Sequence, residues 1–233
     1  MFVDGYLFSS KRWYIRTIIP LSSILSDIDN NWLGATENKK KMIKDCLIIN
    51  CTGKNDIIAL KINNKFFLKK IQTNIVKYEA LSLTVLDFIN KHNVVIDKKF
   101  SILVNSGPGS FSGIRIALAV AKGIQLVKKL NIYSYNSFLL NAAPYLKKRE
   151  GFISIIKINN FYYFSEGIID KTYNFSAPKK LDLGYLKTSN LQVIIPDEIK
   201  KDEIIYNTDK KKLCIVEFDL KNVDILIENN LLE

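Results

Sequence analysis

The 233-residue sequence has a single histidine, His92, and three cysteines, Cys46, Cys51 and Cys214. Zinc sites and Ser-His-Asp or Cys-His hydrolases need histidine beside further ligands or a nucleophile. Nothing around His92 suggests such a role, and it is expected at a solvated helix end. The cysteines show neither CxxC spacing nor an even-numbered framework, so we interpret them as reduced core thiols of a cytoplasmic protein.

Long hydrophobic runs are also missing. No stretch approaches the ~20 apolar residues that a membrane helix needs. A secretory signal is not expected near Met1, because Asp4 interrupts a basic start and Pro20 breaks the apolar stretch that follows. With 48% hydrophobic residues, the chain can bury a sizeable core. These features predict a globular protein that does not enter the membrane.

Acidic residues are comparatively few, 23 against 34 lysines and arginines, which gives a net charge of +11. Such a charge suits a nucleic-acid binder. However, the lysines form scattered pairs and triplets without an aromatic-interleaved stripe, so a solvated basic surface is favoured. Lys147, Lys148 and Arg149 keep an RNA site open as the alternative. The pairs and triplets are Lys39–Lys41, Lys98–Lys99, Lys128–Lys129, Lys179–Lys180 and Lys210–Lys212.

The order of expected elements indicates an α/β protein. Residues 1–41 lack a sustained period and are interpreted as an appendage. Strand-like runs then form an antiparallel meander from Cys46, and a helix is expected over 75–91. The buried strand Ser101–Asn105, a Gly-Pro-Gly turn and a helix over 111–129 follow. Strand, glycine turn and helix in succession are typical of α/β folds.

The second half adds a helix near 137–146, further strands and a C-terminal amphipathic helix. We divide the chain into an extension or misannotated start (1–41), an N-terminal lobe (42–134) and a smaller, divergent second lobe (135–233). No internal repeat in the residues proves that the two lobes are similar.

Most of the specific information lies in the segment NSGPGSFSGIRIALAVAKGIQ, residues 105–125. Gly107 and Gly109 flank Pro108 where a buried strand must turn sharply, and Ser110 or Ser112 can cap the helix that follows. A helix start can also hold an anion, but a tight turn plus cap is the favoured interpretation. A Lys-Ser/Thr ending is absent, which excludes a P-loop.

The helix that follows the turn needs cover on more than one side. Gly113, Ala117 and Ala121 recur every fourth residue as a stripe of small side chains, beside an apolar band. Only a narrow side is polar, so the helix is either buried in its own core or partly covered by a partner subunit. The wide apolar arc of the 75–91 helix favours the partner.

The segment GPGSFSGIR, Gly107–Arg115, resembles the GPGSFTGxR hallmark of the TsaB family, formerly YeaZ, with Ser112 in place of Thr. The preceding strand, meander, helix and motif strand follow in the family's order. The resemblance weakens after Tyr145 and does not cover residues 1–41. Met42 stands where family chains usually start. Residues 1–41 are therefore expected to be an extension or a misannotated start.

This resemblance implies an actin/Hsp70-like (ASKHA) α/β fold with ribonuclease-H-like lobes and mixed sheets. It also implies a non-catalytic subunit that pairs with TsaD, which transfers threonylcarbamoyl to the adenosine beside the tRNA anticodon with help from ATP-binding TsaE. No metal or tightly bound cofactor is expected, ATP is used by the complex, tRNA is reached through it, and a homodimer is possible. The motif residues are Gly107, Pro108, Gly109, Ser110, Phe111, Gly113 and Arg115. The expected partner-interface residues are Tyr78, Leu81, Val85, Ile89, Gly113, Ala117 and Ala121.

Two departures from the family remove chemistry. Asn50 stands at the family's acidic position on the first strand, and Lys77–Glu79 stands where histidine is common. A kinase on this fold would need carboxylates to hold Mg²⁺ near the nucleotide phosphates. A degenerate kinase-like protein is therefore a weak alternative, and a standalone tRNA-binding module is the remaining one.

Overall fold

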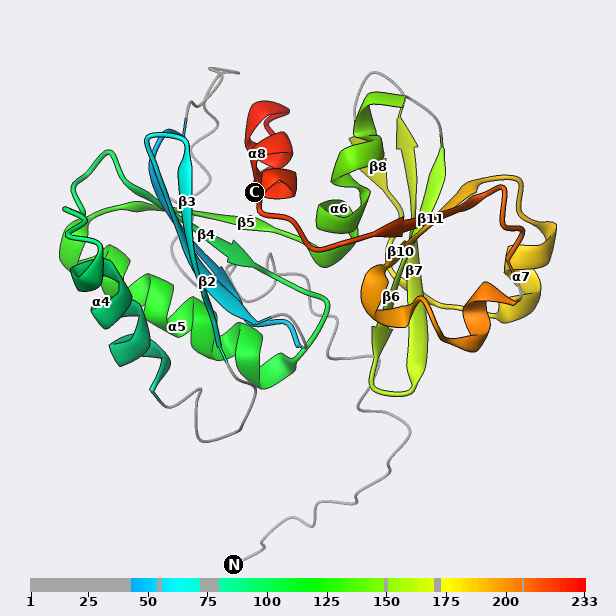
Figure 1. The fold of residues 1–233 in the computed structure, drawn as a ribbon, viewed down its shortest axis with the longest axis horizontal. Coiled ribbons are helices and arrows are strands. Elements are labelled where there is room, and N and C mark those ends of the chain that lie inside the picture. Colours follow the sequence, from blue (N-terminus) through cyan, green and yellow to red (C-terminus); the bar gives the residue numbers. More distant parts are fainter. Residues whose placement is uncertain (1–42, 54–55, 72–79, 149–150, 170–172, 207) are drawn as a thin grey trace, which may run out of the picture. The chain divides into compact units, whose positions relative to one another are not determined.

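The computed structural model describes residues 43–53, 56–71, 80–148, 151–169, 173–206 and 208–233 (Figure 1). All of these residues belong to one compact unit, Lys40–Glu233. The expected extension, residues 1–41, lies outside the described residues.

The first sheet has the strand order β3-β2-β1-β4-β5. β1 (Cys46–Asn50), β2 (Ile57–Ile62) and β3 (Lys65–Lys70) form the predicted antiparallel meander, while β4 (Ser101–Asn105) and β5 (Asn131–Tyr135) run parallel to β1. The β2–β3 turn holds two asparagines with positive φ, as a tight hairpin requires. β1 and β4 are buried along their whole length, which explains their unbroken apolar sequence.

Two helices pack on this sheet and bury one of its faces. α4 (Leu81–Lys91) and α5 (Phe111–Lys128) share an apolar core with β1, β2 and β4. The expected helix over 75–91 is confirmed from Leu81 onward, and residues 72–79 lie outside the described part of the chain. The helix expected near 137–146 is divided into α6 (Ser137–Ala142) and a 3₁₀ segment, η2 (Ala143–Lys148).

The second sheet has the order β11-β10-β6-β7-β8. β7 pairs antiparallel with β6 and β8, whereas β10 runs parallel to β6 and β11, so the arrangement repeats that of the first sheet. The two sheets therefore share one topology, although the sequence shows no internal repeat that predicts it. Its strands are β6 (Phe152–Ile158), β7 (Phe161–Ile169), β8 (Tyr173–Phe175), β9 (Lys179–Lys180, paired with β7), β10 (Gln192–Pro196) and β11 (Leu213–Val216). The remaining helical segments are α7 (Leu183–Thr188), η3 (Asp197–Ile199), η4 (Glu203–Ile205) and α8 (Lys221–Glu228).

One apolar core joins the two sheets. It contains residues of β1, β2, β4 and β5 from the first sheet and of β6, β10 and β11 from the second, together with α6, η2 and α8. An ion pair of 2.5 Å between Lys61 Nζ and Asp224 Oδ1 also ties β2 to α8. Backbone bonds of 2.7 and 2.9 Å pair Glu233 with Ser134 of β5. The predicted α/β class with two mixed sheets is confirmed.

Candidate functional site at the glycine-rich turn

The Gly-Pro-Gly turn connects β4 to α5 in a conformation that requires its glycines. Gly107 has φ +94° and is followed by a cis peptide bond to Pro108. A Cβ on Gly109 would lie 2.6 Å from Thr52 Cβ and would overlap the Thr52 carbonyl oxygen. That carbonyl accepts a 2.7 Å hydrogen bond from Ser110 N. The turn is therefore packed directly against the segment that follows β1.

A polar network fills the space where β1 and β4 end. Asn50 Oδ1 accepts hydrogen bonds from Asn105 Nδ2 (2.9 Å) and Thr52 Oγ1 (3.0 Å). Asn105 Oδ1 accepts from Gly107 N (2.8 Å) and from Ser137 Oγ (3.2 Å). Both asparagine side chains are buried. The network joins β1, β4, the turn and α6.

Ser110 is the helix cap. Its backbone is extended, and its Oγ accepts from Gly113 N at 3.3 Å, whereas Ser112 is exposed within the first turn of α5. Phe111 is 47% exposed, and the Arg115 guanidinium lies 5.1 Å from its ring centroid. Of the two predicted caps the structure selects Ser110, and the motif ends in an exposed aromatic–cation pair at the start of α5.

The residues expected at a partner interface lie in the core instead. On α4, Leu81, Val85 and Ile89 are buried, and on α5 the small-residue stripe faces the sheet. A partner cannot reach these side chains while the core is intact, so we correct their assignment from interface to core. Tyr78, the remaining expected contact, lies outside the described residues. The corrected residues are Leu81, Val85, Ile89, Gly113, Ala117 and Ala121.

α5 also has an uncharged outer face, which includes Ile116, Val120 and Val127 of the predicted apolar band and which the sequence analysis did not assign to the partner. At about 100° per residue, its members fall within an arc of roughly 120°, which Arg115 and Lys122 border on one side. Each is exposed or half-buried, and Gly123 has open space where a Cβ would be. The signal was present in the sequence, but the small-residue stripe had been assigned to the partner. The α5 outer face consists of Ser112, Ile116, Ala119, Val120, Gly123, Leu126 and Val127.

Neighbouring α4 also exposes apolar side chains. Leu83 is 64% exposed and Leu86 is 49% exposed, although the helix buries its other leucine, Leu81, completely. The two helices contact each other over the first sheet. Large exposed aliphatic residues on adjacent helices are a feature of protein–protein contact surfaces.

The thiols beside the turn are poorly suited to nucleophilic chemistry. Burial, with a smaller contribution from the nearby carboxylate of Asp56, raises the pKa of Cys51 to about 12. Burial likewise raises the pKa of Cys46 to about 12. Because the thiolate is the reactive form, both cysteines are protonated and inert at neutral pH.

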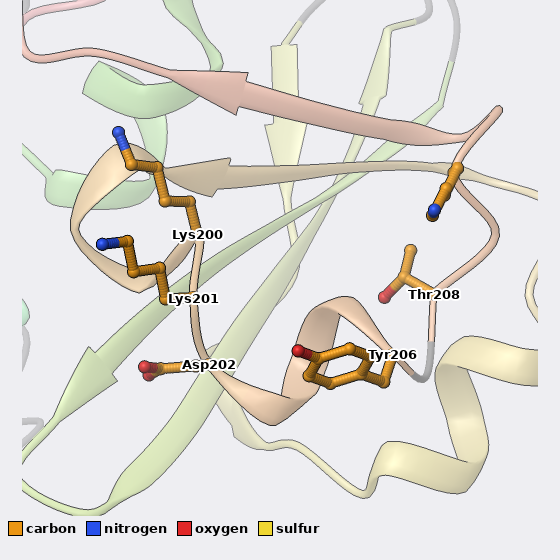
Figure 2. A pocket seen from close by; sticks show the side chains of 6 residues that line it. Lys200, Lys201, Asp202, Tyr206 and Thr208 are labelled. Atoms are coloured by element: carbon orange, nitrogen blue, oxygen red, sulfur yellow. The ribbon is translucent and has the colours of Figure 1, made fainter.

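A surface hollow of about 300 Å³ lies on the second lobe (Figure 2). Lys200 and Lys201 extend away from Tyr206 and Thr208, so the polar groups do not converge on one point. Asp202 accepts hydrogen bonds from Lys157 (2.7 Å) and Tyr162 (2.9 Å). We therefore do not assign a small-molecule site there. The lining residues are Lys200, Lys201, Asp202, Tyr206, Thr208 and Lys210.

Among the residues that the structure describes, no group of three or more histidine, cysteine, aspartate or glutamate side chains lies close enough to hold a metal ion. None of the helices in this part of the chain is long and apolar enough to cross a membrane.

No family model matches the sequence. The chain is 36% identical over 87 residues to the tRNA threonylcarbamoyladenosine biosynthesis protein TsaB of Buchnera aphidicola subsp. Baizongia pistaciae. That match covers 37% of this chain and 39% of the relative, well under two thirds of its length.

Solved structures match over much more of the chain. YeaZ from Pseudomonas aeruginosa has a TM-score of 0.56 at 14% identity, covering 81% of this chain and 91% of YeaZ. A second structure, described as similar to peptidase YeaZ from Pseudomonas aeruginosa, has a TM-score of 0.57 at 13% identity with the same coverage. The fold is that of an actin-like (ASKHA) α/β protein. The predicted resemblance to the TsaB/YeaZ family thus agrees with a sequence match over part of the chain and with a shared fold over most of it.

Proposed function

We propose that this chain acts in threonylcarbamoyladenosine formation on tRNA as a non-catalytic TsaB-type subunit that pairs with TsaD. The motif turn and the sequence match to a TsaB protein support the pathway. The α5 outer face supports the pairing, because an uncharged helix surface of this extent is better satisfied by a partner than by water. This face is the single observation that carries the proposal.

The residues at the strand ends support a structural rather than a catalytic role for this chain in the complex. Asn50 and Asn105 bind each other and the turn, so their polar groups hold the start of α5 in place. The proposed subunit contributes no acid, base or nucleophile, and TsaE and ATP act on the complex rather than on this chain. A kinase-like activity is disfavoured because Asn50 replaces a carboxylate that could hold Mg²⁺.

The pairing is tested by placing a carboxylate on the α5 outer face. Ala119→Glu would bury an unpaired charge against the partner and should weaken binding to TsaD by at least about tenfold, without unfolding the isolated chain. Lys122→Glu is the matched control on the polar side of the same helix and should bind normally. The measurement is light scattering of chain–TsaD mixtures after size-exclusion chromatography, with circular dichroism of each variant.

Three outcomes decide the proposal. Loss of the complex in Ala119→Glu alone supports the α5 outer face as the interface. Normal pairing by folded Ala119→Glu removes the face from the proposal. Two independent peaks for the wild-type chain and TsaD, also with tRNA and ATP present, would overturn the proposed function itself.

A further inference from the structure

Lysines that are far apart in the sequence meet at one edge of the first sheet. β1, β4 and β5 are parallel, and their first residues lie in register, Cys46 opposite Ser101 and Ser101 opposite Asn131. The segments that lead into these strands therefore reach the same edge, where the α4–β4 and α5–β5 connections also lie (Figure 1). Each of these segments contains lysine: Lys44 before β1, Lys98 and Lys99 before β4, and Lys128 and Lys129 before β5.

Two more lysines reach this edge from neighbouring elements. Lys65 begins β3 after the tight turn beside the start of β1. Lys91 ends α4, and the ring of the next residue, His92, lies 4.4 Å from that of Phe67 in β3. We call the complete set the edge lysines: Lys44, Lys65, Lys91, Lys98, Lys99, Lys128 and Lys129.

The edge lysines are exposed, and none forms an ion pair with a described residue. Three carboxylates occur in the same segments. Asp45 accepts from Asn63 N (2.8 Å), Asp97 accepts from Lys99 N (2.8 Å), and Asp87 lies one turn before Lys91. Positive charge therefore dominates this edge, whereas the lysine-rich segment 197–212 of the second lobe holds equal numbers of acidic and basic residues.

The lysines form a row and not a pocket. Neighbouring strands lie about 4.8 Å apart, so five strands spread the ammonium groups over roughly 20 Å. Helix dipoles favour lysine at the ends of α4 and α5, but they do not account for Lys44, Lys98 or Lys99. A row of separate point charges fits a ligand with repeated phosphates better than a single small anion.

We propose that the edge lysines bind the phosphate backbone of RNA without reading its sequence, since phosphate contacts position a nucleic acid but do not specify it. The choice of tRNA as the RNA rests on the proposed function. Through this contact the subunit would bind the tRNA directly, in addition to the binding by its partner.

The test measures binding of the full chain to labelled tRNA by fluorescence anisotropy between roughly 50 and 200 mM salt. The edge variant carries Lys98→Gln, Lys99→Gln, Lys128→Gln and Lys129→Gln. The control removes the same charge from the second lobe with Lys187→Gln, Lys201→Gln, Lys210→Gln and Lys211→Gln, all of which are exposed. Pairing with TsaD is measured for each variant.

The edge variant should bind tRNA at least about tenfold more weakly, with a log–log salt dependence shallower by roughly three units, while the control stays close to wild type. Equal losses in both variants, or no wild-type binding at low salt, would overturn the proposal. An edge variant that binds tRNA normally but no longer pairs with TsaD would also overturn the proposal. So would an edge variant that binds tRNA normally but no longer binds anionic lipid vesicles. If the chain pairs normally with TsaD but does not bind tRNA, this contact is refuted and the proposed function is unaffected.

Discussion

At the residue scale, the motif glycines have distinct tasks that a family pattern alone does not separate. Gly107 supplies a positive φ, Gly109 allows contact with the Thr52 backbone, and Gly113 faces the sheet from α5. Gly123, in the same helix, has open space around it. The same substitution should therefore have opposite effects at different glycines.

Gly109→Ala is expected to destabilise the chain by about 1–3 kcal/mol, because its Cβ would overlap Thr52 backbone that cannot easily move. For a chain of this size the melting temperature should fall by about 2–12 °C. Gly123→Ala is the matched control and should stabilise α5 by about 0.5–1 kcal/mol. Calorimetry of both variants checks this, and equal melting temperatures would contradict the geometry of the turn.

The buried thiols make a pH-dependent contribution. Unfolded Cys46 and Cys51 lose their protons near their ordinary pKa of 9.0, but the folded chain holds them until about pH 12. Raising the pH through this window therefore favours the unfolded state, by about 1 kcal/mol per thiol at pH 10. Urea unfolding at about pH 8 and pH 10 should show a smaller loss of stability in Cys51→Ala than in the wild type.

At the element scale, local sequence determined the parts of the fold that local physics controls. The meander, the buried strand Ser101–Asn105 and the α5 cap followed from periodicity, turn residues and a serine before the helix. The face of α5 that packs on the sheet did not follow, because Gly113, Ala117 and Ala121 suit close approach to a sheet as well as to a partner helix. Only tertiary contacts distinguish the two.

The clustering of the edge lysines was not predicted for a related reason. Lys98–Lys99 and Lys128–Lys129 are scattered along the chain, and nothing local relates them. Parallel strand order places both pairs at the same edge. Charge clusters made by topology are invisible to a search along the sequence, whereas clusters within one segment are easy to see and, as in 197–212, can be neutralised by their own carboxylates.

Helix caps provide a prediction at this scale. Asn136 Oδ1 accepts from Leu139 N at 2.7 Å, whereas the Ser110 cap bond is 3.3 Å. Asn136→Ala should therefore cost about 1 kcal/mol, and Ser110→Ala should cost less. Chemical denaturation of the two variants provides the comparison. A larger loss in Ser110→Ala would show that its hydroxyl does more than cap α5.

At the scale of the whole molecule, charge pairing links α8 to the first sheet. The Lys61 side chain is 9% exposed and its partner Asp224 is 26% exposed, so Asp224→Asn leaves a nearly buried ammonium without its counter-ion. The expected loss is about 1–3 kcal/mol. Asp197→Asn breaks a pair with Lys200 whose side chains are 37% and 45% exposed, and it should change stability by under about 0.5 kcal/mol. Urea unfolding of both variants provides the measurement, and similar losses would contradict a structural role for the Lys61–Asp224 link.

The shared core predicts that both sheets unfold together. Leu139, Val216 and Leu226 belong to one apolar cluster that includes strands of each sheet, so each lobe buries part of its apolar surface only in contact with the other. The decisive variant is Leu186→Ala, because Leu186 is buried in a separate cluster confined to the second lobe. Its loss should destabilise the chain by about 2–5 kcal/mol.

If the lobes are one cooperative unit, hydrogen exchange in Leu186→Ala should accelerate in β1 as much as in β6, although β1 contains no residue of that cluster. Peptide-resolved mass spectrometry under conditions where exchange follows global opening measures both strands in one sample. Leu226→Ala, which opens a cavity in the shared core, is the positive control and should affect both strands equally. Acceleration limited to β6 in Leu186→Ala would mean that the second lobe opens alone, and that the shared core positions the lobes without making their folding interdependent.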